Sequence, residues 1–262
     1  MRPLLRIGSI LLGTALCAVQ VQAQVEGGPW PDGRKTAVVL TYDDSLPSHL
    51  DIAIPALDKV GLKGTFFLIG KQLGPDQIER WRAASQEGHE LANHTLRHAC
   101  LQGDNAEGRK LGSSDSYDVE MMLEEIQMMN NLLSAIDGKA RHGYATPCGQ
   151  HLAGGVDYLP ALRESNIVQY HRGAWWAGET ELDPMDLPAT WFDEKATGAD
   201  MIAAVEKASE SGGLVVLGFH GVGGDYLKVN AKAHAELLAY LKANEDKIWV
   251  APLSSVMAHT GR

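Results

Sequence analysis

Cysteine, aromatic residues and positive charge are all scarce in this chain. Its 262 residues include 3 cysteines, and aromatic residues make up 6%. So few thiols exclude a small fold stapled by disulfides, and a chain of this length can bury a full hydrophobic core without them. Lys and Arg total 23 against 33 Asp and Glu, which gives a net charge of −10. Because phosphate backbones and anionic membrane surfaces repel such a chain, we expect no nucleic-acid partner and a neutral or cationic substrate.

Long hydrophobic runs are also missing, with one exception at the start of the chain. Arg2 and Arg6 flank the beginning of an apolar run, which leads to the small-x-small pattern of a cleavage site at 21–23. We therefore expect residues 1–23 to be a secretory signal peptide and the protein to be periplasmic or secreted. Cleavage removes two arginines and no acidic residue, so the net charge changes from −10 to −12. No other run is long and apolar enough to span a bilayer.

Two cysteines, Cys100 and Cys148, remain after that cleavage. An exported protein can oxidise such a pair to a disulfide, but two reduced thiols can also pack as small apolar groups in a core. The spacing alone leaves both alternatives open.

Short apolar runs rich in β-branched residues alternate with amphipathic stretches along the rest of the chain. We expect strands over 35–41, 64–69, 89–93, 142–145, 167–170, 214–219 and 248–251. We expect helices over 47–60, 75–87, 117–136, 157–165, 199–211 and 229–244. This alternation indicates parallel βα units in one α/β domain. Residues 24–35 are Gly/Pro-rich, and we expect them to form a loose arm. No linker or internal repeat divides the chain, so we expect a single domain over 36–262.

Two histidines and two aspartates follow the ends of expected strands. His94 and His98 come after the strand at 89–93, four residues apart, so both imidazoles can point at one cation. Such a pair on its own is more often structural, but Asp43 and Asp44 end another expected strand. A barrel gathers residues of this kind on one rim, at the carboxyl ends of its strands. Two imidazoles and one carboxylate would leave a zinc ion an open fourth position for catalysis.

The two adjacent carboxylates have different expected roles. Neighbouring side chains at a strand end diverge, so only one of Asp43 and Asp44 can join the histidines as a ligand. The other stays ionised beside the cation and can accept a proton from water. His220 ends the expected strand at 214–219 and suits a proton donor for a leaving group, although a lone histidine there could also be a core residue.

In order and approximate spacing, these residues resemble the motifs of a known enzyme family. The Thr-Tyr-Asp-Asp sequence at 41–44, the His-Thr-x-x-His sequence at 94–98 and the late strand ending in His220 are similar to those of the polysaccharide deacetylases, which are carbohydrate esterase family four and share the NodB-homology domain. The resemblance covers about residues 36–253. It implies a single-domain distorted (β/α) barrel. It also implies one divalent metal, with Zn²⁺ as the first choice and Co²⁺ or Ni²⁺ as alternatives.

The resemblance also implies roles and a reaction. Asp44, His94 and His98 would hold the metal, Asp43 would be the base and His220 the acid. The reaction would be direct hydrolysis of an acetyl group on a carbohydrate. The substrate could carry N-acetyl groups, as chitooligosaccharide or peptidoglycan does, or O-acetyl groups, as acetylated xylan does. An alternative of another class is a degenerate carbohydrate-binding barrel without turnover. The oligomeric state stays open.

The third motif of the family departs from its usual pattern here. Family members place an arginine two residues before the motif proline to steady the base, and Ala145 stands at that position. The proline and glycine of the motif are present as Pro147 and Gly149, so the resemblance implies that the backbone N–H of Cys148 faces the oxyanion. We expect Arg172, after the strand at 167–170, to replace the missing guanidinium, with an ordinary surface arginine as the alternative.

Two further features stay open. The fourth motif, an aspartate near a tryptophan that orients the acidic histidine, has three candidate residues in Asp186, Trp191 and Asp193. The adjacent pair Trp175-Trp176 is a candidate platform for stacking a sugar ring, although adjacent tryptophans are commonly one buried and one exposed residue.

Overall fold

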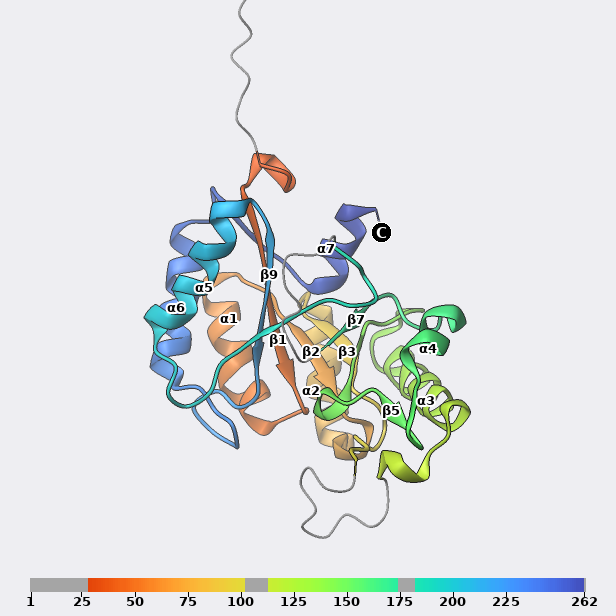
Figure 1. Ribbon diagram of the computed structural model, residues 1–262. Helices are drawn as coiled ribbons and strands as arrows, with labels where there is room; N and C mark the ends of the chain where they lie inside the picture. The colour runs from red at the N-terminus through yellow and green to blue at the C-terminus, as the bar shows by residue number, and fades with distance from the viewer. Residues whose placement is uncertain (1–27, 102–112, 174–181, 262) are drawn as a thin grey trace, which may run out of the picture.

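The computed structural model describes residues 28–101, 113–173 and 182–261, and its centre is a curved parallel sheet (Figure 1). The order of strands is β7-β4-β3-β2-β1-β9-β8, with β10 paired to the start of β1. The strands are β1 (Thr36–Asp43), β2 (Thr65–Leu68), β3 (Glu90–Asn93), β4 (Tyr144–Ala145), β7 (His171–Arg172), β8 (Thr190–Trp191), β9 (Leu214–Phe219) and β10 (Ile248–Val250). Every pairing within this sheet is parallel, so all the carboxyl ends lie on one rim.

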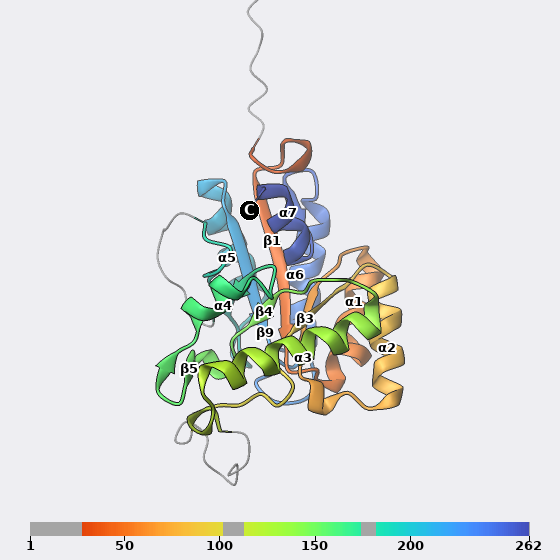
Figure 2. The same cartoon turned by 90° about the vertical axis from the view of Figure 1, so that its right-hand side faces the viewer.

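The helices follow the strands in sequence, and all but the last pack outside the sheet. Helices α1, α5 and α6 lie together beside β1 and β9, whereas α3 and α4 lie beyond β3 and β4 (Figures 1 and 2). The bounds are α1 (Ile54–Val60), α2 (Pro75–Gln86), α3 (Val119–Asp137), α4 (Leu159–Ser165), α5 (Gly198–Ser211), α6 (Ala231–Ala243) and α7 (Leu253–Thr260). A small antiparallel hairpin, β5 (Leu152–Ala153) and β6 (Val156–Asp157), completes the fold. Among the described residues, no helix combines the length and the apolar character needed to cross a membrane.

Alternate residues of β1 face two different cores, as the two-residue period of a strand requires. Val38 and Leu40 pack in the cluster shared with the outer helices. Ala37 and Val39 pack inside the curved sheet, in a cluster that includes Leu253 of α7. A strand buried on both faces reads as a continuous apolar run, which is why the sequence predicts it clearly. The expected single-domain distorted (β/α) barrel is confirmed.

Local signals account for the boundaries of the long helix α3. Asp118 caps α3 by accepting a hydrogen bond from the N–H of Met121, and Gly138 ends the helix in the left-handed conformation. At 47–60 the sequence predicts one regular helix, but a π-helical turn, η2 (His49–Ala53), precedes α1. His49, the first residue of that turn, lies with its Nε2 2.9 Å from the backbone oxygen of His220.

Two expectations about the fold are wrong, and one helix is missed. The strand expected at 167–170 lies at His171–Arg172 instead, because these polar residues pair with β4 and are buried in the site, where hydrophobic patterning does not find them. Helix α7 is not predicted at all. The described part of the expected loose arm, 28–35, is packed: Trp30 is buried and its indole N–H donates to the carbonyl of Gly212 at 3.2 Å.

Candidate metal and catalytic site

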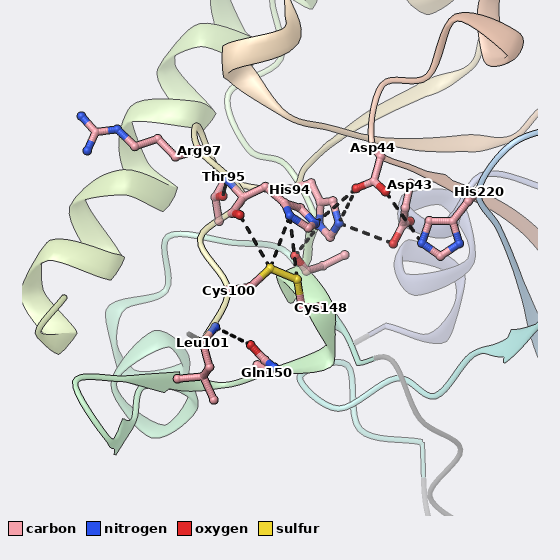
Figure 3. The surroundings of a disulfide bond; sticks show 12 residues. Asp43, Asp44, His94, Thr95, Arg97, Cys100, Leu101, Cys148, Gln150 and His220 are labelled. Carbon is pink, nitrogen blue, oxygen red and sulfur yellow. Dashed lines mark hydrogen bonds and ion pairs between the residues drawn. A yellow bond between two sulfur atoms is a disulfide. The ribbon is translucent and has the colours of Figure 1, made fainter. Parts of the chain in front are cut away.

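The sequence-predicted residues come together at the carboxyl rim of the sheet. Asp43 is the last residue of β1, Asp44 follows it, His94 follows β3 and His220 follows β9. Figure 3 shows these four side chains facing one another. Asp44 has φ of 83°, and His98, on the loop after β3, has φ of 55°. Left-handed backbone at non-glycine residues costs free energy and clusters at functional sites.

Asp44, His94 and His98 form a donor set suited to a metal ion. One ligand atom from each lies within 4.8 Å of the other two. The Nε2 atoms of His94 and His98 lie 3.4 and 3.2 Å from Asp44 Oδ1. That oxygen is buried and lacks a hydrogen-bond partner among the described residues, so its lone pairs and those of the imidazoles face a common point. Two nitrogens and one carboxylate oxygen fit zinc, cobalt or nickel.

The orientation of His94 supports the same interpretation. Its Nδ1 lies 2.9 Å from the carbonyl oxygen of Ala145. Because a carbonyl only accepts, Nδ1 carries the proton and Nε2 keeps its lone pair toward Asp44. Metal-ligating histidines are commonly fixed in this way by a backbone carbonyl.

The charge state of Asp44 also fits a metal site. Burial alone would raise the pKa of Asp44, but the two imidazoles beside it hold that pKa well below its usual range. Burial lowers the pKa of His98. Burial acts the same way on His94, but Asp43 and Asp44 outweigh it and raise the pKa of that imidazole. The carboxylate is therefore ionised, as a metal ligand must be.

A buried arginine, Arg172 of β7, holds Asp43 at the end of β1, although β7 and β1 are not neighbouring strands. Nη2 of Arg172 lies 2.6 Å from both carboxylate oxygens of Asp43, and the two side chains are 1% and 4% exposed. The guanidinium lies over the rings of Phe67 and Trp191, at 4.6 and 4.9 Å from their centroids. Arg172 of β7 is the direct register partner of Ala145 of β4. The guanidinium therefore comes from β7, whereas the family motif would place it on the adjacent strand, β4. The alternative that Arg172 is an ordinary surface arginine is wrong.

His220 lies on the other side of Asp44. Its Nε2 is 3.8 Å from Asp44 Oδ2, and its ring stacks on Trp191 with centroids 4.9 Å apart. Burial lowers the pKa of His220, opposed by the nearby carboxylates. Nε2 of His49 lies 2.9 Å from the backbone oxygen of His220 and donates to it. Of the three candidates for the fourth motif, Trp191 contacts His220, whereas Asp193 accepts from the N–H of Lys195.

Two residues at the site are not predicted by the sequence pattern. The hydroxyl of Tyr226 donates to Asp44 Oδ2, and its side chain is half exposed beside His220. Ser45 accepts a hydrogen bond from the N–H of Ile69 at 2.7 Å, which ties the turn after Asp44 to β2. An aromatic residue in an irregular loop has no periodicity, so no pattern finds it. The pair Trp175-Trp176 lies outside the described residues.

Cys100 and Cys148 form a disulfide, which decides between the two alternatives left open by the sequence. The bond lies beside the donor set (Figure 3): Nδ1 of His98 is 3.6 Å from the sulfur of Cys100 and 3.9 Å from that of Cys148. Cys148 has φ of 56°, so the loop that carries the expected oxyanion N–H is also left-handed at this residue.

Three buried histidines make the fold sensitive to acid. Burial lowers the pKa of His49, His171 and His234 to about 4 each. In the unfolded chain the pKa of histidine is about 6.5, so unfolding takes up protons between these values and stability falls as the pH falls. Each histidine contributes about 1.4 kcal/mol per pH unit, so the three together lower the free energy of unfolding by about 4 kcal/mol per unit below roughly pH 6. Urea unfolding at a series of pH values measures this slope.

A matched variant tests the cause of that slope. His234 contacts the hydroxyl of Tyr42 at 2.7 Å and lies away from the metal donor set. We expect His234→Gln, which still offers a polar group to Tyr42 but does not titrate, to reduce the slope by about a third. Unfolding free energies of the wild type that stay constant from pH 7 to pH 5 would contradict the prediction.

The comparisons with known proteins agree with this geometry. The family model described as polysaccharide deacetylase matches residues 31–162, half of the chain. YxkH of Bacillus subtilis (strain 168), named as a polysaccharide deacetylase, is 32% identical over 82 residues. That match covers 30% of this chain and 29% of YxkH, so it spans less than a third of the relative.

Solved structures share the fold. A protein of Mycobacterium smegmatis named as a polysaccharide deacetylase matches with a TM-score of 0.64 at 21% identity, over 88% of this chain and 91% of that one. An allantoinase, PuuE, matches with a TM-score of 0.63 at 14% identity, over 88% and 92% of the two chains. At such identities the likeness shows the fold and not the substrate. The match of the family model over half of the chain shows more: the chain belongs to the polysaccharide deacetylase family.

Proposed function

We propose that this protein is a metal-dependent hydrolase that removes acetyl groups from a carbohydrate. The observation that carries the proposal is the convergence of Asp44, His94 and His98 on one point, beside an Asp43 carboxylate that a buried arginine holds. One divalent ion, zinc in the first place, would be held by the first three residues. A metal at this position would polarise the acetyl carbonyl and lower the pKa of a water molecule.

The chain's own residues supply the proton transfers. Asp43 lies beside the donor set, with its Oδ2 3.6 Å from Nε2 of His94, and accepts the proton of the attacking water. Arg172 binds both of its oxygens and so keeps the carboxylate in one orientation. His220 donates a proton to the departing amine or alkoxide, and the backbone N–H of Cys148 donates to the developing oxyanion.

The choice of acetyl group depends on the rim loops rather than on the donor set. We propose N-acetyl groups of chitooligosaccharide or peptidoglycan type as the first candidate, because an amine leaves only when it is protonated and His220 lies where it can donate. O-acetyl groups, as in acetylated xylan, are the alternative. Export to the periplasm or the exterior, where such polymers occur, is part of the proposal and is supported by the pattern of residues 1–23.

An acetate-release assay tests the proposal. Protein loaded in turn with Zn²⁺, Co²⁺ or Ni²⁺ is incubated with N-acetyl chitooligosaccharides, acetylated xylan and an aryl acetate, and free acetate is measured. We expect turnover with at least one substrate and none after metal removal. Without acetate release from any of them by any loaded form, the enzyme proposal fails and the carbohydrate-binding barrel takes its place.

A further inference from the structure

The two ring nitrogens of His98 face two different sets of possible metal ligands. Nε2 lies 3.2 Å from Asp44 Oδ1, in the donor set described above. Nδ1 faces the sulfur atoms of Cys100 and Cys148, and His98 with these two cysteines forms a second group whose ligand atoms lie within 4.8 Å of one another. The two groups share only His98.

We propose that Cys100, Cys148 and His98 form a second, inhibitory metal site when the disulfide is reduced, and that this site takes the metal from Asp44 and His94. Reduction by a dithiol transfers two electrons and two protons to the disulfide, which gives two thiols and the oxidised dithiol. A metal ion then displaces the proton from each thiol and binds the thiolates. The inference rests on the proposed function for its effect on turnover but not for the existence of the site.

The competition follows from the chemistry of imidazole. A neutral imidazole has one lone pair and therefore binds one metal ion at a time. With the disulfide intact, the sulfurs carry no charge, and Nε2 is free to serve the site at Asp44. With two thiolates beside Nδ1, the ring binds the metal through Nδ1, and its proton moves to Nε2. The Nε2–H group then points at Asp44 Oδ1, 3.2 Å away, and donates to it instead of ligating.

The second donor set is also the stronger one for zinc. Two thiolates and one imidazole form a known zinc ligand set that leaves one position for water. Zinc and cobalt bind soft thiolates more tightly than they bind a carboxylate. Thiolates on a tetrahedral zinc ion lie about 3.8 Å apart, given Zn–S bonds of about 2.3 Å. The Cα atoms of Cys100 and Cys148 are 6.0 Å apart, so side-chain adjustment suffices. Cys148 is exposed, which gives a reductant access to the bond.

Cobalt spectroscopy tests the proposal without reference to turnover. The wild type is reduced with a phosphine, desalted without oxygen and given one equivalent of Co²⁺. We expect a thiolate-to-cobalt charge-transfer band in the near ultraviolet, which the oxidised protein and the Cys100→Ser/Cys148→Ser variant lack. We expect the reduced Asp44→Asn variant to keep the band, because Asp44 is not a ligand of the second site. Absence of the band in reduced wild type, or its loss in reduced Asp44→Asn, would overturn the proposal.

Acetate release then separates competition from loss of the cross-link. The Cys100→Ser variant has no disulfide, keeps one of the two thiols and leaves Cys148 unchanged. With one equivalent of cobalt, we expect reduced wild type to release acetate at least about tenfold more slowly than this variant, the size of effect that perturbing a ligand's environment has on metal affinity. Equal rates in the two would overturn the inhibitory part of the proposal. If no form releases acetate, the proposed function fails, and the spectra still decide whether the second site exists.

Discussion

Replacing Arg172 by alanine is expected to lower the free energy of unfolding by about 3–5 kcal/mol, because it leaves the buried carboxylate of Asp43 without its charged partner. Turnover is expected to fall by about 100-fold or more, since a misplaced reacting group costs this much in general. KM should change little, because the guanidinium is buried and contacts Asp43 rather than the exposed loops where a sugar would bind. Urea unfolding and the rate of acetate release at saturating metal and substrate measure the two effects.

The register of β4 and β7 offers a matched rescue variant. Ala145 and Arg172 are direct partners across these strands, so an arginine at 145 approaches Asp43 from the adjacent strand. We expect Ala145→Arg/Arg172→Ala to recover part of the lost kcat. We expect Arg172→Lys to stay impaired, because it keeps the charge but lacks the planar guanidinium that lies over Phe67 and Trp191. If Arg172→Ala has the turnover of the wild type, Arg172 has no positioning role. If it loses stability alone, its role is structural.

Residues at the ends of apolar strands are predictable from the sequence, whereas contacts across the fold are not. Val38 to Asp43 reads as a buried strand that ends in polar residues, and parallel strands place such ends together, so Asp43, His94 and His220 could be grouped in advance. Tyr226 and Ser45 contact the same site from irregular segments. Their contribution depends on the path of the loops, which no local pattern encodes.

The role of Arg172 is only partly predictable from the sequence. The absence of the expected arginine at Ala145 shows that a cation is missing, but the partner strand that supplies it depends on sheet order. Because His171 and Arg172 are polar, the hydrophobic pattern ends at Tyr170 and misses the strand that carries them. The pairing of Cys100 with Cys148 has the same character, since it depends on the distance between two loops and not on spacing. Hydrophobic patterning fails at polar residues that are buried for function, because the method assumes that buried residues are apolar.

The two adjacent aspartates are expected to separate turnover from metal binding. Asp43→Asn should reduce turnover by roughly 10²–10⁴-fold, because an amide cannot accept the proton of water, yet it should bind metal as the wild type does. Asp44→Asn should bind metal much more weakly, because Asp44 Oδ1 faces both imidazoles and an amide lacks the charge of the carboxylate. The two variants are isosteric and adjacent, so each is the control for the other.

Metal content after equilibrium dialysis, measured beside acetate release at saturating metal, distinguishes the two roles. His98→Ala should resemble Asp44→Asn, since it removes another ligand of the same ion. Asp43→Asn also leaves Arg172 partly unpaired, so its thermal unfolding is compared with that of the wild type to exclude loss of folded protein. Equal loss of metal in Asp43→Asn and Asp44→Asn would refute the division of roles. Full turnover in Asp43→Asn would assign the base to another residue.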